Sequence, residues 1–365
     1  MTTAALKTRD AARSGPVLRQ AWADLKRDKA QLRARDAANE LGVSEGALIA
    51  SLCGASGEAR AVRLKDSGAD IIKDVPALGP VMALTRNDNC VHEKIGPYLD
   101  VSINPGHGLV LGELIDLRIF PAHWRHAFAV MEETKEGLRR SIQVFDASGT
   151  AVHKIFQKPH TNIDEFDKLI DKWTGEDQSP EFHALAPLPK RKDRKDTEID
   201  LAGLRAHWAA LQDTHDFFGM LRDFSVGRLQ ALRLAGPEFA QRVDVTSLAH
   251  SLELAQKDGT PIMVFVGNPG CIQIHSGPVK NLKRMGPWFN VLDPDFNLHL
   301  REDKIVSAWV VYKPTRDGVV TSLELYDSDD FCFAQFFGAR KPGKPELQGW
   351  RTIAAALPRI EGGNA

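Results

Sequence analysis

One histidine stands among large apolar residues in the second half of this chain. At helical spacing Trp208, Leu211, His215 and Phe218 fall on one side of a helix that we predict at the start of residues 207–236. An imidazole in that position can be a core residue whose hydrogen bonds are satisfied, or a neutral ligand for a metal. The pattern leaves both interpretations open.

The chain repeats itself at an offset of 181 residues, the separation of Val81 from Ile262. The stretch VMALTRNDNCVHEKIGPY from Val81 matches IMVFVGNPGCIQIHSGPV from Ile262, and SIQVFDASG from Ser141 matches SLELYDSDD from Ser322. A repeat of this length indicates a duplicated domain rather than an array of short repeats.

The two copies differ at positions whose side chains can bind a ligand. The second copy carries a histidine, two cations and an aromatic residue at four such places: His215 for Ala34, Arg228 for Ala47, Phe265 for Leu84 and Lys313 for Glu132. Conversely, the first copy has an arginine, Arg118, where the second copy has His299. This asymmetry predicts one specialised site per chain, built largely on the second copy.

The chemistry of these residue types favours haem among metal-bearing ligands. A neutral imidazole can bind iron, large apolar side chains suit a flat ring, and Arg and Lys bind the carboxylates of propionates. We expect Arg228 to begin the helix after the one that carries His215, with DFSVG as the turn between them. The spacing alone favours a histidine of the core whose hydrogen bonds are satisfied.

Helical patterns open each copy, over residues 17–54 and 201–256. Alternating or apolar runs bounded by Gly, Pro, Asn and Asp follow, which predicts strands and hairpin turns. No glycine-rich phosphate loop lies between a strand and a helix, which argues against a nucleotide-binding parallel sheet. The sequence therefore predicts an α+β fold with antiparallel sheet, in which a linker at 174–200 joins repeats at 1–173 and 201–365.

The composition is typical of a soluble globular protein. The 365 residues carry a net charge of −1, so no overall field favours nucleic acid or an anionic membrane. The first residues lack the apolar segment of a secretory signal, and no apolar run approaches the ~20 residues of a membrane span. The four cysteines form no CxxC pair, as in proteins with reduced thiols. We expect a cytoplasmic protein without membrane insertion.

Along nearly its whole length the chain resembles the cytoplasmic haemin-degrading or haem-trafficking factors of bacterial haem-uptake operons, the HemS/ChuS/PhuS type. The resemblance depends on five stretches that occur in one order: DTHDFFGML, PIMVFVGNPGCIQIHSGPV, DFNLHL, YKPTRDGVVTSLELYD and AQFFGARKPG. It implies two similar halves, each a large antiparallel sheet flanked by helices, with a haem cleft between the halves.

The resemblance also implies roles for individual residues. His215 matches the proximal ligand of the haem iron, and Arg118 matches a residue of the distal face. Further positions match residues that line the haem pocket or its propionate edge: Phe120, Arg228, Phe265, Lys313, Gln335 and Arg340. The chain departs from some members of the family in having Asp216 and Phe218 where these have further histidines, and Phe337 where these have a tyrosine.

Two other histidines are candidates for a secondary iron ligand. His92 corresponds to Gln273 in the repeat, which favours a shared polar surface position. His299 falls in a predicted strand, where a packed sheet residue is the simpler interpretation.

By the same resemblance, the chain would bind haem b in the cytoplasm and deliver it to a haem oxygenase, with an inner-membrane haem importer as a further partner. The alternative is that it opens the porphyrin ring itself with electrons from an external donor, Arg118 then stabilising bound oxygen as a distal group. DNA binding is a third interpretation, because ELGVSEGALIASLCG from Glu40 is similar to a helix-turn-helix. The absence of a basic recognition helix argues against it.

Overall fold

The computed structural model describes residues 14–57, 59–65, 68–135, 137–187, 192–340 and 343–360. The chain forms two compact units. The first comprises Met1–Arg86, Glu93–Pro189 and Gly267–Gln273, and the second comprises Asn87–His92, Lys190–Val266 and Ile274–Ala365. Each unit therefore includes a short segment that belongs, in sequence, to the other repeat.

The first unit contains helices and 3-10 turns in the order α2 (Gly15–Asp28), α3 (Ala34–Leu41), α4 (Glu45–Ala50), η1 (Asp70–Leu78), η2 (Pro121–His123) and α5 (Ile163–Trp173). Its strands are β1 (Ala59–Arg63), β2 (Val81–Arg86), β4 (Val101–Ile103), β5 (Gly108–Leu111), β6 (Asp116–Ile119), β7 (His126–Thr134), β8 (Gly137–Phe145) and β9 (Ala151–Gln157). The ends of β3 (Cys90–Gly96) and β12 (Cys271–Gly277) fall in different units.

The second unit contains η3 (Asp196–Glu198), α6 (Leu201–Ala209), α7 (Asp216–Asp223), α8 (Arg228–Ala235), α9 (Ser247–Asp258), η4 (Glu302–Lys304) and α10 (Gln348–Ala356). Its strands are β10 (Ala240–Val243), β11 (Ile262–Asn268), β13 (Leu282–Met285), β14 (Trp288–Leu292), β15 (Phe296–Arg301), β16 (Ser307–Thr315), β17 (Gly318–Tyr326) and β18 (Cys332–Gly338). The last two residues of β11, Gly267 and Asn268, fall in the first unit.

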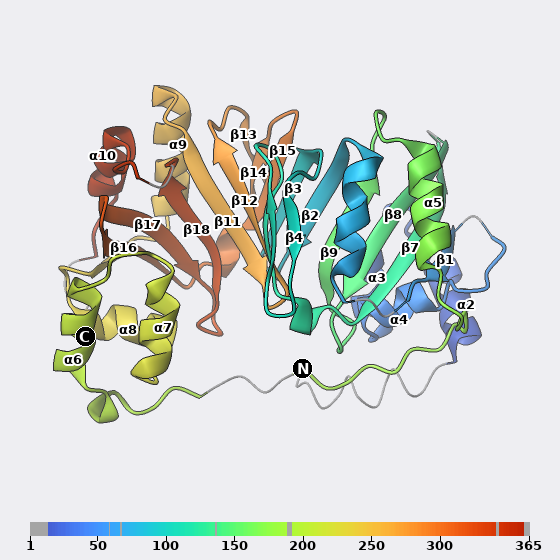
Figure 1. Ribbon diagram of the computed structural model, residues 1–365, viewed down its shortest axis with the longest axis horizontal. Coiled ribbons are helices and arrows are strands. Elements are labelled where there is room, and N and C mark those ends of the chain that lie inside the picture. The colour runs from blue at the N-terminus through green and yellow to red at the C-terminus, as the bar shows by residue number, and fades with distance from the viewer. Residues whose placement is uncertain are drawn as a thin grey trace. The chain divides into compact units, whose positions relative to one another are not determined.

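The strand orders show the duplication directly (Figure 1). Two nine-stranded sheets have the orders β1-β7-β8-β9-β2-β3-β15-β14-β13 and β10-β16-β17-β18-β11-β12-β6-β5-β4. Pairs such as β7–β8 and β16–β17 are antiparallel. Each strand of the second order occupies the place of its repeat counterpart in the first. The predicted α+β fold of two repeats with antiparallel sheets is confirmed.

Alternating side chains give each sheet two covered faces. In β7, Ala127 and Ala129 belong to the core that includes α5, while Phe128 and Val130 belong to the core that includes α2, α3 and α4. This period of two is what a strand requires when both of its faces are buried.

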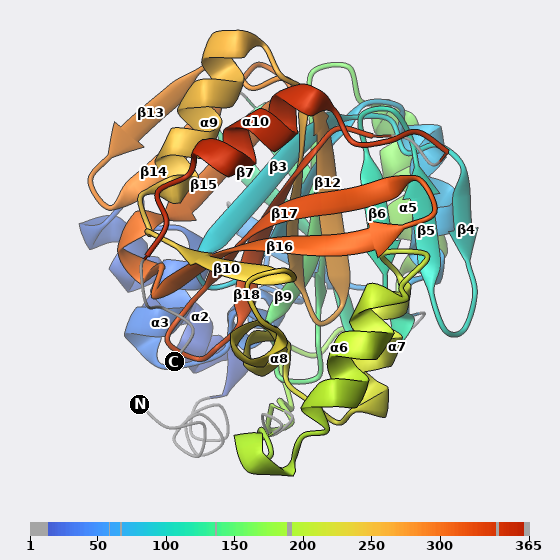
Figure 2. The same ribbon diagram turned by 90° about the vertical axis from the view of Figure 1, so that its left-hand side faces the viewer.

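The second unit follows the same rule. In β16, Val310 belongs to the core with α9 and α10, while Trp309 and Val311 belong to the core with α6, α7 and α8. Figure 2 shows these two groups of helices on opposite sides of β16 and β17. The helices α7 and α8 therefore cover one defined face of the β16–β17–β18 sheet.

The segment predicted as a linker packs against the protein on both sides of residues 188–191, which lie outside the described range. Before this gap, Phe182 is buried in the core of α2, α3 and α4. After it, the Gln230 side chain of α8 donates to the carbonyl of Arg194 at 2.6 Å and to Asp196 at 2.7 Å. The described parts of 174–200 on both sides of these residues therefore contact the rest of the protein.

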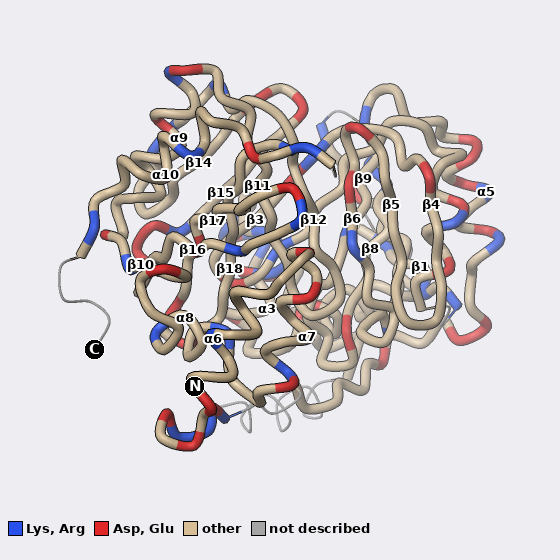
Figure 3. The backbone as a smooth tube through the Cα atoms, turned by 60° about the vertical axis from the view of Figure 1, so that its left-hand side comes forward, with Lys and Arg blue, Asp and Glu red and all other residues tan. Residues whose placement is uncertain are grey.

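In the part of the chain that the structure describes, no helix has the length and apolar character needed to cross a bilayer. Figure 3 shows basic and acidic residues of the described chain interspersed with one another along the backbone.

Candidate functional site

The helix predicted around His215 is in fact two helices, α6 and α7, and His215 immediately precedes the second. Trp208 is buried as expected, but 84% of the His215 side chain is exposed, and so is 63% of Phe218. Phe217 instead packs inward against Trp208, with ring centroids 4.7 Å apart. The predicted apolar stripe through His215 is therefore wrong, because the turn between the helices changes which residues face the core.

A neighbouring carboxylate orients the exposed imidazole. Asp213 Oδ1 lies 2.6 Å from Nδ1 of His215 and 2.9 Å from its backbone nitrogen. The backbone N–H and then the ring of His215 hold the pKa of the Asp213 carboxyl below its usual range. Because a carboxylate can only accept, Nδ1 carries the hydrogen and the lone pair of a neutral ring is on Nε2.

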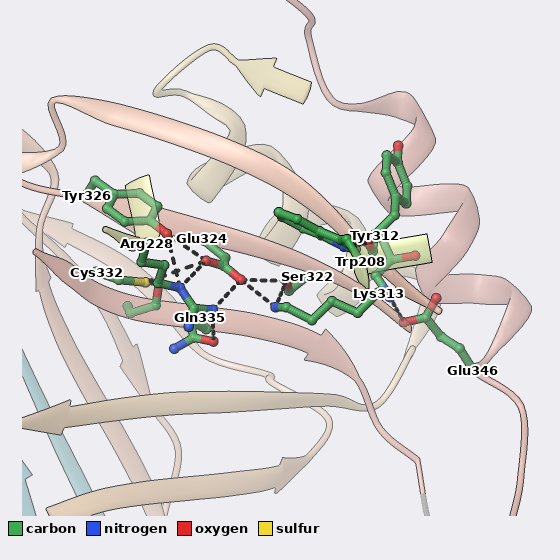
Figure 4. A network of polar contacts seen from close by, with 12 residues as sticks. Trp208, Arg228, Tyr312, Lys313, Ser322, Glu324, Tyr326, Cys332, Gln335 and Glu346 are labelled. Atoms are coloured by element: carbon green, nitrogen blue, oxygen red, sulfur yellow. Dashed lines mark hydrogen bonds and ion pairs between the residues drawn. The ribbon is translucent and has the colours of Figure 1, made fainter. Parts of the chain in front are cut away.

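Arg228 begins α8, as predicted, and its side chain lies against strands β17 and β18 (Figure 4). Nε and Nη2 donate to the two carboxylate oxygens of Glu324 at 2.8 and 2.6 Å. Nη2 also donates to Oε1 of Gln335 at 3.2 Å, and Nε to the hydroxyl of Tyr326 at 3.2 Å. The guanidinium is thus held in a fixed orientation by groups on two strands.

Lys313 of β16 binds the same carboxylate, its Nζ lying 2.8 Å from Oε1 of Glu324. Glu324 is fully buried and also accepts from the hydroxyls of Ser322 and Tyr326, at 3.0 and 2.7 Å. Burial acts to raise its pKa, but the charges of Arg228 and Lys313 outweigh that effect and lower it. Two cations share one carboxylate, which leaves one positive charge in excess while both are protonated. Burial, opposed by the charge of Glu324, lowers the pKa of Lys313.

Aromatic rings border the cations. The guanidinium carbon of Arg228 lies 5.2 Å from the ring centroid of Phe217 and 5.4 Å from that of Phe218. On the strands, the ring of Phe265 contacts that of Phe337 at a centroid distance of 4.9 Å. Phe265 is half-buried and lies opposite Gln335 in the β11–β18 pair.

Arg340 follows β18, and its Nη1 lies 3.9 Å from Oδ2 of Asp317. Its positive charge also contributes to the low pKa of Asp213, which relates it to the Asp213–His215 pair. The structure therefore places His215, Arg228, Phe265, Lys313, Gln335 and Arg340, the predicted residues of the second repeat, within one unit.

Arg118 and Phe120 belong to the other unit. Arg118 lies on β6, where Nη1 forms an ion pair with Asp116 and donates to the carbonyl of Leu117 at 3.2 Å. About a third of its side chain, 32%, is exposed. Phe120 is half-buried at the end of that strand, and its backbone N–H donates to the carbonyl of Gly270 at 3.0 Å.

The two other candidate histidines are parts of the sheets. His92 is fully buried against Phe296, with ring centroids 4.9 Å apart, and Gln273 is fully buried as well. The interpretation of these two as a shared surface position is therefore wrong. His299 lies across the β14–β15 pair from Asn290, whose Oδ1 is 2.7 Å from Nδ1 of the ring, as a packed sheet residue would be.

Sequence reasoning missed Asp213 and Glu324, the two carboxylates that hold the site's histidine and cations. A signal for Glu324 was present in the repeat, because the matching residue of the first copy is the neutral Gln143. The same offset pairs Asp213 with the apolar Leu32, but a polar residue before a helix is most simply a turn or cap residue, so this difference did not point to a partner for His215.

The arrangement combines an imidazole with an available Nε2, a pair of cations with one surplus charge, and exposed or half-buried aromatic rings. Among the described residues no three His, Cys, Asp or Glu side chains group as a metal site.

The chain is similar to known proteins along most of its length. The model of the family described as "Haemin-degrading HemS.ChuX domain" matches the chain twice, at residues 42–173 and 225–357. The hemin transport protein HemS of Yersinia enterocolitica is 39% identical over 325 residues, which cover 89% of this chain and 92% of that protein.

Two solved structures are similar over almost the entire chain. Holo-PhuS, a heme-binding protein from Pseudomonas aeruginosa, has a TM-score of 0.92 and 47% identity, covering 95% of this chain and 100% of that one. ChuS, described as an Escherichia coli heme oxygenase, has a TM-score of 0.83 and 34% identity, covering 93% of this chain and 99% of that one.

Proposed function

This chain belongs to the haemin-degrading HemS.ChuX family, and from this membership and the geometry of its second unit we propose that it binds haem, as iron protoporphyrin IX, and passes it on. His215 binds the iron through Nε2. Arg228, Lys313, Gln335 and Arg340 serve the propionates, Phe265 lines the pocket, and Arg118 and Phe120 contribute from the distal side.

The observation that carries this proposal is the exposed imidazole of His215, held by Asp213 with Nε2 available. A histidine of the core would be buried and would use both ring nitrogens internally. A metal-binding histidine commonly donates its other N–H to a carboxylate, as this one does. The surplus charge near Arg228 and Lys313 matches the carboxylate that a propionate would supply.

We propose delivery to a haem oxygenase as the cellular role, in the cytoplasm and downstream of an inner-membrane haem importer. A single protein ligand, His215, suits a carrier because one bond to iron has to break when the haem leaves. The relatives named for hemin transport and heme binding support this role.

Haem degradation by the chain itself is the second candidate, and the observation that favours it is the likeness to ChuS, described as a heme oxygenase. Arg118 would then stabilise negative charge developing on an oxygen ligand. An isomer-specific tetrapyrrole product formed in the presence of catalase would support this function, because catalase removes the peroxide that degrades haem non-enzymatically.

The test of haem binding is a titration of the apoprotein with haemin, followed by the Soret absorption. We expect a saturable complex in the wild type and a shifted or absent Soret band in His215→Ala. Arg228→Ala should bind more weakly while the bound form keeps a spectrum close to the wild type. Identical spectra and affinities for wild type and His215→Ala would contradict the ligand assignment.

A further inference from the structure

We propose that Asp213 is the positioning residue of the iron ligand, fixing the tautomer of His215 and strengthening its bond to ferric iron. This inference rests on the proposed function for the iron itself. The part that concerns the tautomer can be tested on the apoprotein, because it states only which ring nitrogen of His215 carries the hydrogen.

The geometry makes Asp213 a specific partner rather than a nearby charge. One oxygen, Oδ1, accepts from both the backbone N–H and the ring Nδ1 of His215, at 2.9 and 2.6 Å. The turn that leads into α7 holds the two residues in this relation, since the N–H of Asp216 donates to the carbonyl of Asp213 at 3.1 Å. The carboxylate thus fixes both the backbone and the ring of His215.

The chemical consequence follows from the position of the hydrogen. A free histidine distributes its hydrogen between two tautomers. Only in the tautomer with Nδ1–H is the lone pair of Nε2 available to a metal. A carboxylate that accepts from Nδ1–H draws electron density into the ring and raises the basicity of Nε2. A more basic axial ligand favours ferric over ferrous iron, so Asp213 would hold haem in the oxidised state.

Two substitutions separate the effect of the hydrogen-bond acceptor on the His215 ring from the effect of the negative charge. Asp213→Ala removes the acceptor, whereas Asp213→Asn keeps an oxygen of similar shape and removes only the charge. Asp216→Asn is the matched control, because it removes an exposed carboxylate from the residue on the other side of His215.

The apoprotein test is the ¹⁵N chemical shift of the His215 ring nitrogens, by long-range ¹H–¹⁵N correlation, at a pH where the ring is neutral. We expect a protonated Nδ1 in the wild type and in Asp216→Asn, and a mixture of tautomers in Asp213→Ala. A wild-type ring protonated mainly on Nε2 would overturn the proposal whether or not haem binds.

The haem test is the Fe(II)–His stretching band by resonance Raman, with the reduction potential and the haemin affinity. We expect a lower stretching frequency and a more positive potential in Asp213→Asn, and a loss of roughly 10–100-fold in affinity in Asp213→Ala. Unchanged values in both variants, with a complex that is lost in His215→Ala, would refute the role of Asp213 and leave haem binding by His215 intact.

Discussion

At the scale of single residues, Glu324 determines whether the cationic cluster can exist at all. Arg228 and Lys313 are both largely buried, with 14% and 4% of their side chains exposed. Taking an ammonium and a guanidinium out of water is unfavourable unless a counter-charge accompanies them. Glu324 supplies that charge with both of its oxygens, and the hydroxyls of Ser322 and Tyr326 complete its hydrogen bonds.

We therefore expect Glu324→Gln to destabilise the fold by about 3–5 kcal/mol, the usual effect of removing one partner from a buried ion pair. The substitution fits the strand sterically, because Gln143 occupies the same place in the first repeat. The measurement is the free energy of unfolding from urea titrations at neutral pH.

The matched control is Asp303→Asn. Asp303 accepts two hydrogen bonds from Arg301, both at 2.7 Å, so the pairing resembles that of Glu324 with Arg228, but it lies at the surface. An exposed pair contributes little because water replaces it, so this variant should unfold close to the wild type. Equal losses in the two variants would mean that burial of Glu324 is not the cause.

Single residues also show what sequence reasoning could and could not reach. The residue types, and the differences between the two copies of the repeat, identified His215, Arg228 and Lys313 as chemically active positions. The family resemblance then assigned their roles. Whether His215 faces the core or the solvent depends on the short turn between α6 and α7. The prediction was wrong because it extended a single helical periodicity across that turn. The repeat distinguishes Glu324 from Gln143 and Asp213 from Leu32, but the residues that these two carboxylates bind required coordinates, because hydrogen bonds between strands and turns leave no spacing pattern.

At the scale of elements, a buried histidine joins several strands of the first unit. His153 of β9 contacts the hydroxyl of Thr85 on β2 through Nδ1 at 2.8 Å and that of Tyr98 through Nε2 at 2.6 Å. Trp124 stacks against the ring at a centroid distance of 6.0 Å. Burial lowers the pKa of His153 to about 3, so the ring is neutral in the folded protein.

This burial predicts sensitivity to acid. Between pH 6.5 and about 3 the unfolded chain binds a proton at His153 that the folded chain does not, so stability is complete above pH 6.5 and falls as the pH is lowered. The slope for one proton approaches about 1.4 kcal/mol per pH unit. The measurement is the free energy of unfolding from urea titrations at pH 7 and pH 5.

His153→Gln provides the comparison, since it removes the titrating ring while keeping polar atoms for Thr85 and Tyr98. We expect a smaller loss of stability between pH 7 and 5 in this variant than in the wild type, whatever its stability at pH 7. The window lies above the ordinary range of carboxyl groups, which limits their contribution. Parallel curves for the two proteins would contradict a neutral, buried His153.

The elements themselves were largely predictable. The order of helices before strands followed from periodicity, and turn residues marked the hairpins, such as the one where Thr315 pairs with Gly318. Gly318 has φ +108°, a conformation that favours glycine. What periodicity could not give was the assignment of β3 and β12, whose ends fall in different units, because strand pairing is a non-local property.

At the scale of the whole molecule, the chain contains one domain twice but the candidate ligands once. The two strand orders are equivalent, and both sheets have helices packed on each of their faces. The first repeat has Ala34, Ala47 and Glu132 where the second has His215, Arg228 and Lys313. Duplication therefore preserved the fold, while the residues that would bind an iron and its anionic substituents remain in one copy.

This asymmetry predicts one haemin per chain. Titration to saturation and native mass spectrometry should both give a single bound haemin, and His215→Ala should show none that survives transfer to the gas phase. Ala34→His alone should not add a second haemin, because the first repeat would still lack a cation in place of Ala47 and would carry Glu132, whose negative charge repels a propionate. Two haemins per wild-type chain, or a second one gained with Ala34→His, would mean that the sheet and helix framework, rather than these three substitutions, decides where haem binds.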